Sequence, residues 1–221
     1  GASAEAGTSL EALAAEVHAF VPQIGTMGIG LSACTVPAAG KPSFVLGDGE
    51  VEYGLGIHGE PGVSRESINT ADAIAARMVG AIVEAKQIPA GEPVVLLVNG
   101  LGGTPPAELA IVAGSAMAAC GARGVHVKRL LVGSFLTAIE MAGCSITLAT
   151  ASNALIERLE APTEASAWLP VLTPSDGSHA VTPPTPAAAL GGTTGPTADP
   201  ATQKIFDAAM RSAAKALIEA E

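Results

Sequence analysis

Apolar residues along the chain follow two periods, one typical of helices and one typical of strands. Recurrence every three or four residues predicts helices over residues 9–20, 71–86, 107–120, 135–141 and 153–159. Short apolar runs bounded by glycine and proline predict strands over residues 27–34, 44–46, 51–57, 93–99, 125–132 and 145–150. Because strands and helices alternate, we expect an α/β fold with a mixed sheet and flanking helices.

Local signals place several boundaries. Thr8 and Glu11 fit a capping box for the first helix, and Asn69 or Thr70 can cap the second. The strand, helix and strand between residues 93 and 132 form a β-α-β unit, which predicts a parallel pair. Asp-Gly at residues 48–49 is a hairpin turn signal, so the chain should emerge from a strand just before residue 58.

The composition changes near residue 170. Residues 171–198 are rich in proline, glycine, threonine and alanine and predict a linker. Trp168 is expected to dock the beginning of this linker onto the domain. Residues 199–221 then show helical apolar spacing and predict one isolated C-terminal helix.

We expect removal of residues 200–221 to leave the thermal unfolding midpoint nearly unchanged, because a helix without its own domain adds little stability. A large drop in that midpoint would show that the helix packs on the α/β body.

Charge and cysteine usage exclude several classes of function. A net charge of -10 over 221 residues, with a pI near 4.8, disfavours a nucleic-acid partner. No apolar run is long enough for a membrane helix, and no signal segment opens the chain. Cys34, Cys120 and Cys144 are odd in number and widely spaced, which argues against disulfides and zinc. We therefore expect a cytoplasmic protein with buried thiols.

The most informative stretch surrounds His58, which lies among four glycines in residues 53–62. Glycine lets the backbone turn tightly and lets a small molecule approach the imidazole closely. A plain alternative is a loop histidine bonded to a neighbouring carbonyl. Glu60 can orient His58 or a substrate hydroxyl, or it can cap the turn.

Other candidate sites are weaker. Residues 99–106 resemble a phosphate cradle but lack the lysine and hydroxyl residues of a P-loop, so a tight turn is favoured. Lys41 is expected to be a solvated loop lysine rather than an anion contact. His18, His126 and His179 form no recognisable ligand set. We therefore predict no metal site and no cofactor site within this chain.

Four segments together resemble the substrate-binding domain of the dihydroxyacetone (glycerone) kinases. They are Gly-Leu-Ser-Ala-Cys-Thr-Val-Pro-Ala-Ala-Gly-Lys-Pro at 30–42, Gly-Leu-Gly-Ile-His-Gly-Glu-Pro-Gly at 54–62, Leu-Val-Asn-Gly-Leu-Gly-Gly-Thr-Pro at 97–105 and Gly-Cys-Ser-Ile-Thr-Leu at 143–148. The resemblance covers roughly residues 1–170, and these residues resemble the second half of that domain.

The resemblance implies a role for His58. In that family the matching histidine binds the carbonyl carbon of dihydroxyacetone covalently as a hemiaminal, which makes it both the catalytic anchor and a substrate-binding residue. Glycerol has no carbonyl and cannot form this bond. The resemblance also implies a homodimer. It further implies a parent enzyme that uses ATP and Mg²⁺ through a helical nucleotide-binding domain in cis. Residues 199–221 resemble the first helix of that domain.

Parts of the family pattern are missing from this sequence. Nothing matches the family's second substrate-contacting histidine or its general-base aspartate, and Gly1 corresponds to mid-domain. We therefore expect this excerpt alone to be inactive. Two alternatives stay open: a non-catalytic ketose-binding or regulatory module, and a kinase for another short ketose such as erythrulose.

Overall fold

The computed structural model describes residues 1–35, 38, 40–42, 44–57, 60–165, 167–168 and 171–174. Residues 1–174 form one compact unit, and residues 175–221 are divided from it. All the described residues belong to the first unit, so the predicted C-terminal helix and most of the predicted linker lie outside them. His58 and Gly59 also lie outside the described residues.

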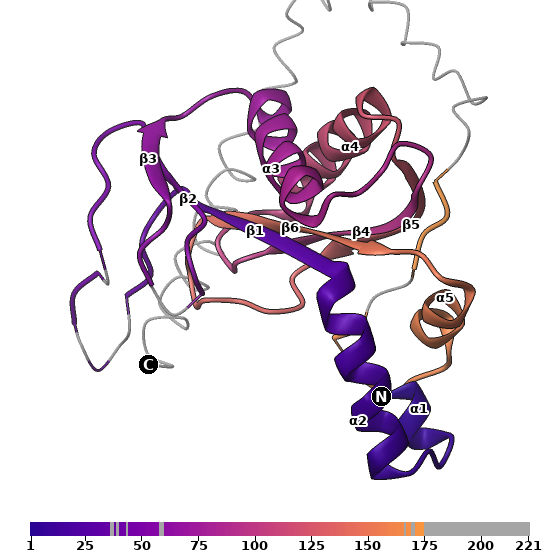
Figure 1. Ribbon diagram of the computed structural model, residues 1–221. Helices are drawn as coiled ribbons and strands as arrows, with labels where there is room; N and C mark the ends of the chain where they lie inside the picture. The colour runs from indigo at the N-terminus through magenta and orange to yellow at the C-terminus, as the bar shows by residue number, and fades with distance from the viewer. Residues whose placement is uncertain are drawn as a thin grey trace, which may run out of the picture. The chain divides into compact units, whose positions relative to one another are not determined.

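A mixed sheet forms the centre of the first unit, with six strands in the spatial order β3-β2-β1-β6-β4-β5 (Figure 1). The strands are β1 (Ile24–Gly30), β2 (Glu50–Tyr53), β3 (Ser64–Ser67), β4 (Pro93–Gly100), β5 (His126–Gly133) and β6 (Gly143–Thr150). Among the described strands, only β4 and β5 pair in parallel, and α4 (Pro106–Ala122) connects them. The predicted α/β fold with a mixed sheet is therefore confirmed.

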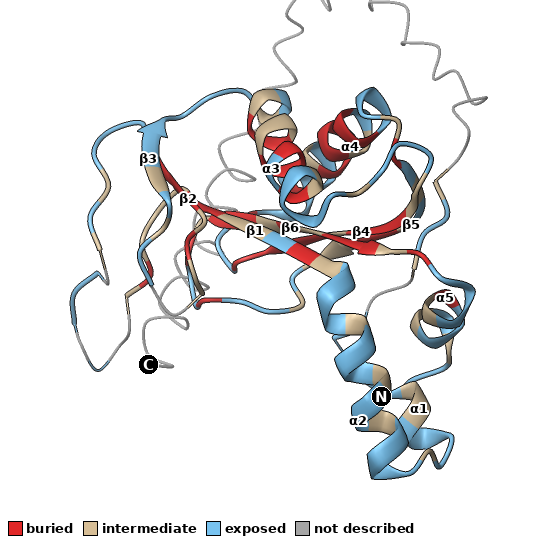
Figure 2. Ribbon diagram, in the orientation of Figure 1, coloured by how far each residue is buried: buried red, intermediate tan, exposed pale blue. Residues whose placement is uncertain are grey.

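Helices cover the two faces of this sheet unequally. α3 (Ala71–Lys86) and α4 pack on one face, whereas the shorter α5 (Asn153–Glu160) packs with the other. α1 (Ala2–Glu5) and α2 (Leu10–Phe20) precede the sheet and contain no buried residue, and a 3-10 turn at Val21–Gln23 leads into β1. Figure 2 shows burial concentrated in the central strands and in the sheet-facing sides of α3 and α4.

Alternation along β4 divides the core into two layers. Leu96 and Val98 are fully buried with α3 and α4. Val95 and Leu97 point to the opposite face, where they pack with α5. Because side chains alternate across a strand, Asn99 also belongs to this second face. The strand thus places a buried amide at its carboxyl end, away from α3 and α4.

The helix caps follow the prediction with one change. Thr70 caps α3, and its hydroxyl accepts the Ala73 N–H at 3.3 Å. The first helix is capped by Ser9 instead of Thr8, since Ser9 accepts the N–H of Ala12. None of the helices in the described ranges has the length and hydrophobicity needed to cross a bilayer.

Three strand predictions are wrong. The strand predicted over residues 51–57 is β2 and ends at Tyr53, so the chain leaves it well before residue 58. β1 begins at Ile24 instead of residue 27 and ends at Gly30 instead of residue 34, because Ile24 pairs with Ala149 and the strand follows β6 over almost its full length. Residues 44–46 form no strand; the hairpin partner of β2 is instead β3, beyond the glycine-rich turn. β3 is polar and largely exposed, so apolar periodicity could not reveal it.

The predicted helix over residues 135–141 is also wrong, because this segment is a loop. The side chain of Asn99 accepts the N–H groups of Phe135 and Leu136, at 2.8 and 2.9 Å, and donates to the Leu136 carbonyl at 2.8 Å. Ile139 has φ +55°, which a right-handed helix excludes. The buried amide thus replaces the bonds that a helical turn would make.

Trp168 docks the chain that follows α5, as the sequence predicts. Its ring lies 5.7 Å from that of Phe135, centroid to centroid, and its indole N–H donates to the Leu159 carbonyl at 3.2 Å. Two further backbone bonds of 2.8 Å join Leu172 to Leu130 of β5. These contacts hold the chain against the sheet up to the last described residues.

Candidate functional site

The glycine-rich turn between β2 and β3 lies on the sheet face opposite α3 and α4. Ile29 points into the core beneath those helices, so its neighbour Gly28 presents the other face. Leu55 passes directly over Gly28, where a Cβ would lie 2.8 Å from the Leu55 carbonyl oxygen. Leu55 then joins a small core cluster with Leu101 and Met141. Glycine in β1 therefore lets the turn lie close against the strand.

Backbone hydrogen bonds fix both stems of this turn. The Gly54 N–H donates to the Gly28 carbonyl at 2.7 Å, and Gly54 has φ +74°. On the returning side, the Val63 N–H donates to the Tyr53 carbonyl at 2.7 Å. His58 lies in sequence between these two anchored stems.

Glu52 is a site residue that sequence reasoning missed. It is only 4% exposed, although it lies in the middle of β2. One carboxylate oxygen accepts the Gly62 N–H at 2.7 Å, and the other lies 3.1 Å from the guanidinium of Arg65. The available signal was a glutamate in the strand that leads into the histidine turn, but strand alternation alone is equally compatible with a solvent-facing residue.

A cavity of about 790 Å³ opens beside the turn. Its size lies within the ~300–1,000 Å³ typical of small-molecule sites. Ile57, the residue before His58, is part of its wall, as are Asn99 and Ser145 at the carboxyl end of β4 and the start of β6. The remaining walls are mostly small or apolar residues of β1, α3 and the turn. The residue that precedes His58 in sequence therefore lies at the border of a cavity.

The glycine-rich turn after β4 is hydrogen-bonded to the chain that leads into β6. The Leu101 N–H donates to the Gly143 carbonyl at 3.1 Å, and the Gly103 N–H donates to the Met141 carbonyl at 2.9 Å. Thr104, which is buried, both donates to and accepts from the backbone of Gly143 at 2.8 Å. These amides face the protein, which supports the tight-turn interpretation over a phosphate cradle.

Glu60 lies on the same turn as His58, but the described contacts concern the backbone. The Gly56 N–H donates to the Glu60 carbonyl oxygen at 3.3 Å, and the Glu60 carboxyl group lies against Gly56. This bond closes the turn through the main chain. The predicted role of Glu60 in orienting His58 stays a prediction, because His58 lies outside the described residues.

The other titratable candidates that the structure describes lie on the surface. His18 in α2 and His126 in β5 are exposed, Lys41 is exposed in its loop, and His179 lies outside the described residues. In the part of the chain that the structure describes, no three histidine, cysteine or acidic residues are grouped to hold a metal ion.

All three cysteines are buried, as predicted. Burial raises the pKa of the Cys144 thiol from its ordinary value of 9.0 to about 11. Burial likewise raises the pKa of the Cys120 thiol to about 11, although the Arg123 charge opposes the shift. Both thiols therefore stay protonated near neutral pH and are unsuited to act as nucleophiles.

These raised thiol pKa values predict a loss of stability at alkaline pH. The unfolded chain ionises these thiols near their ordinary pKa of 9.0, whereas the folded protein holds them protonated up to about 11. Their stabilising contribution is thus complete below pH 9.0 and is lost as the pH rises towards 11. Urea unfolding midpoints should fall across this window, and less steeply in Cys144→Ala. An equal slope in the variant would contradict the assignment.

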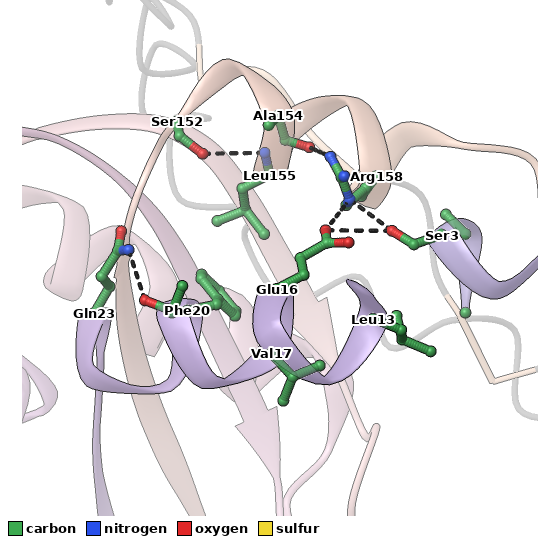
Figure 3. Close-up of a pocket in the computed structure, with 13 residues that line it drawn as sticks. Ser3, Leu13, Glu16, Val17, Phe20, Gln23, Ser152, Ala154, Leu155 and Arg158 are labelled. Atoms are coloured by element: carbon green, nitrogen blue, oxygen red, sulfur yellow. Dashed lines mark hydrogen bonds and ion pairs between the residues drawn. The ribbon is translucent and has the colours of Figure 1, made fainter. Parts of the chain in front are cut away.

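A second cavity of about 380 Å³ lies between α2 and α5 (Figure 3). Arg158 forms an ion pair with Glu16 and donates to the Ser3 hydroxyl at 2.7 Å, while Leu13 and Val17 supply apolar walls. The charged groups of this cavity are paired with each other, and it lies at the N-terminal helices, away from the turn.

Residues 1–167 match a family model described as the Dak1 domain. The chain is 43% identical over 173 residues to the triokinase/FMN cyclase of Bos taurus, a match that covers 76% of this chain and 30% of the relative. It is 42% identical over 169 residues to the dihydroxyacetone-binding subunit of a PTS-dependent dihydroxyacetone kinase from Listeria innocua, with coverage of 76% and 51%. The chain thus spans about a third to a half of the length of these relatives.

Two solved structures share this fold. A dihydroxyacetone kinase operon co-activator superposes with a TM-score of 0.68 at 34% identity, over 73% of this chain and 50% of that one. The dihydroxyacetone kinase of C. freundii superposes with a TM-score of 0.66 at 26% identity, over 78% and 31%. One of these neighbours is named for regulation and the other for catalysis.

Proposed function

Because this chain belongs to the Dak1 domain family, we propose that it is the ketose-binding part of a dihydroxyacetone kinase and that His58 binds dihydroxyacetone covalently. The observation that carries the proposal is the cavity whose wall includes Ile57, the residue before His58. The Listeria relative, named for binding dihydroxyacetone, supports the choice of ligand.

The covalent step is an addition that needs no leaving group. The lone pair of a neutral imidazole nitrogen attacks the ketone carbon, and the carbonyl π electrons move to its oxygen. The proton on the other ring nitrogen is released as a proton reaches the new alkoxide, so the hemiaminal is neutral overall. This bond fixes a small, mobile substrate in one orientation for phosphoryl transfer.

The same step explains selection for a ketone. Glycerol offers similar hydroxyl groups to the cavity but has no electrophilic carbon, so it cannot form the bond. The small residues in the cavity wall, including Gly28 and Gly56, leave room for a short polyol but do not select one polyol over another. Selectivity therefore depends on the reaction with His58.

ATP and Mg²⁺ would be bound elsewhere in the parent enzyme. The C. freundii kinase has been solved in complex with AMP-PNP and Mg²⁺. In this chain the N–H groups of Leu101 and Gly103, after β4, donate to protein carbonyls, so this glycine-rich turn does not fit a nucleotide phosphate. We assign residues 1–170 to the second half of the ketose-binding domain, 171–198 to a linker and 199–221 to the first helix of a nucleotide-binding domain.

A regulatory module is a second candidate, favoured by the structural likeness to the operon co-activator. A kinase needs an acceptor-activating base and a nucleotide site from sequence outside the described cavity, whereas a ketose sensor needs neither. The reading frames on either side of this sequence distinguish the two. An upstream aspartate and a downstream acidic metal-binding loop would support the kinase.

Calorimetric titration of the 221-residue chain tests the proposed function. Dihydroxyacetone should bind much more tightly than glycerol, while erythrulose, as a related ketose, measures how narrowly the cavity selects. Binding of glycerol as tight as that of dihydroxyacetone would contradict covalent capture.

A further inference from the structure

The Glu52 carboxylate is buried on the sheet face that carries the turn. Removing a carboxylate from water is unfavourable unless donors replace the lost hydration. Strand pairing by β2 needs only backbone groups, so the sheet itself gives no reason for a charge at this position. The partners of the carboxylate therefore indicate its role.

Those partners lie at the point where the turn returns to the sheet. The Gly62 N–H donates to one carboxylate oxygen at 2.7 Å, and a Cβ on Gly62 would lie 2.7 Å from Glu52 Cγ, so the backbone passes directly over the side chain. Arg65 in β3 lies 3.1 Å from the other oxygen and donates to the Val45 carbonyl at 3.0 Å. One carboxylate thus joins the turn, β3 and the loop before β2.

We infer that Glu52 is a positioning residue, which fixes the returning stem of the turn whose sequence includes His58 and so supports ketone binding at the cavity. The inference rests on the proposed function. The outgoing stem is already held by the Gly54 bond to β1. Without Glu52 the returning side keeps the Val63 bond to Tyr53 and the Gly56–Glu60 main-chain bond but loses the side-chain acceptor of the Gly62 N–H, so this stem is held less firmly beside the cavity.

Two substitutions separate positioning from bulk stability. Glu52→Gln keeps an acceptor for the Gly62 N–H, so the dissociation constant for dihydroxyacetone should stay within about threefold of the wild-type value. Glu52→Leu fills similar volume without an acceptor, and the constant should rise on the order of tenfold. Calorimetry gives the constants, thermal unfolding confirms that each variant is folded, and amide exchange at Gly62 should accelerate only in Glu52→Leu.

Glu50→Leu is the matched control, since Glu50 lies in the same strand and accepts the Gly47 N–H at 2.9 Å on the opposite end of β2. It should bind dihydroxyacetone like the wild type. Equal weakening by Glu50→Leu, or unchanged binding by a folded Glu52→Leu, would overturn the inference. Should Glu52→Leu fail to fold, Glu52→Met offers an unbranched side chain of similar length that also lacks the acceptor for the Gly62 N–H, and an unchanged constant in that folded variant would also overturn the inference.

The outcomes keep the two proposals distinct. If the wild type binds dihydroxyacetone and His58→Ala does not, while Glu52→Leu behaves as the wild type, only the role of Glu52 is wrong. If the wild type does not bind the ketone, or His58→Ala binds it equally well, the proposed function itself is wrong.

Discussion

Replacing His58 with alanine is expected to raise the dissociation constant for dihydroxyacetone on the order of 100-fold, about 2.7 kcal/mol. The loss is large because a covalent bond disappears and only hydroxyl contacts remain. Glycerol, which never forms that bond, should bind the variant as it binds the wild type. In a full-length kinase the same change should raise KM for dihydroxyacetone and let glycerol compete better.

His126→Ala is the matched control, because His126 is exposed in β5 and takes no part in the cavity wall. Calorimetry on both variants, with both ligands, gives the selectivity directly. An unchanged ratio of the two dissociation constants in His58→Ala would refute the anchoring role.

Gly143→Ala should destabilise the fold by about 3–5 kcal/mol, from backbone strain and overpacking together. Gly143 opens β6 at the centre of the sheet with φ +148°, and a Cβ there would overlap the Ile29 carbonyl oxygen and lie 3.2 Å from the Gly30 Cα. The Thr104 hydroxyl forms two hydrogen bonds of 2.8 Å with the backbone of Gly143, so the chain cannot move aside. Urea denaturation measures the loss.

Gly114→Ala provides the contrast within the same protein. Gly114 is exposed in α4, and apart from the backbone of its own helix no atom lies within 4 Å of the place a Cβ would take. Alanine there should stabilise the protein by roughly 0.5–1 kcal/mol, because glycine loses more backbone entropy in a helix. Similar destabilisation by both substitutions would show that the sheet centre is not the sensitive position.

The parts of the fold that depend on local signals could be predicted from the sequence. The apolar run of β4 and the capped, periodic α3 lie where the pattern placed them. β3 cannot be predicted from the sequence, because its residues are polar and show no apolar periodicity, and it forms a strand by pairing with β2. The sequence predicts a helix over residues 135–141, whereas the structure has a loop there, because Asn99, which bonds this segment, belongs to another part of the chain, β4.

The candidate site divides in the same way. Glycines around His58 mark a turn from sequence alone, since their spacing is local. Burial of Glu52 depends on the turn folding back over β2, and the contact between Leu55 and Gly28 depends on pairing across β1. Residues that support a site through distant segments therefore become visible only in the structure.

The central claim is that His58 forms a bond to the ketone carbon, and carbon NMR of dihydroxyacetone labelled with ¹³C at that carbon observes the bond directly. On adding the protein, the labelled signal should move from the ketone region to that of a tetrahedral carbon bearing oxygen and nitrogen, and His58→Ala should abolish the shift. A bound ligand whose labelled carbon keeps its ketone signal would contradict the account.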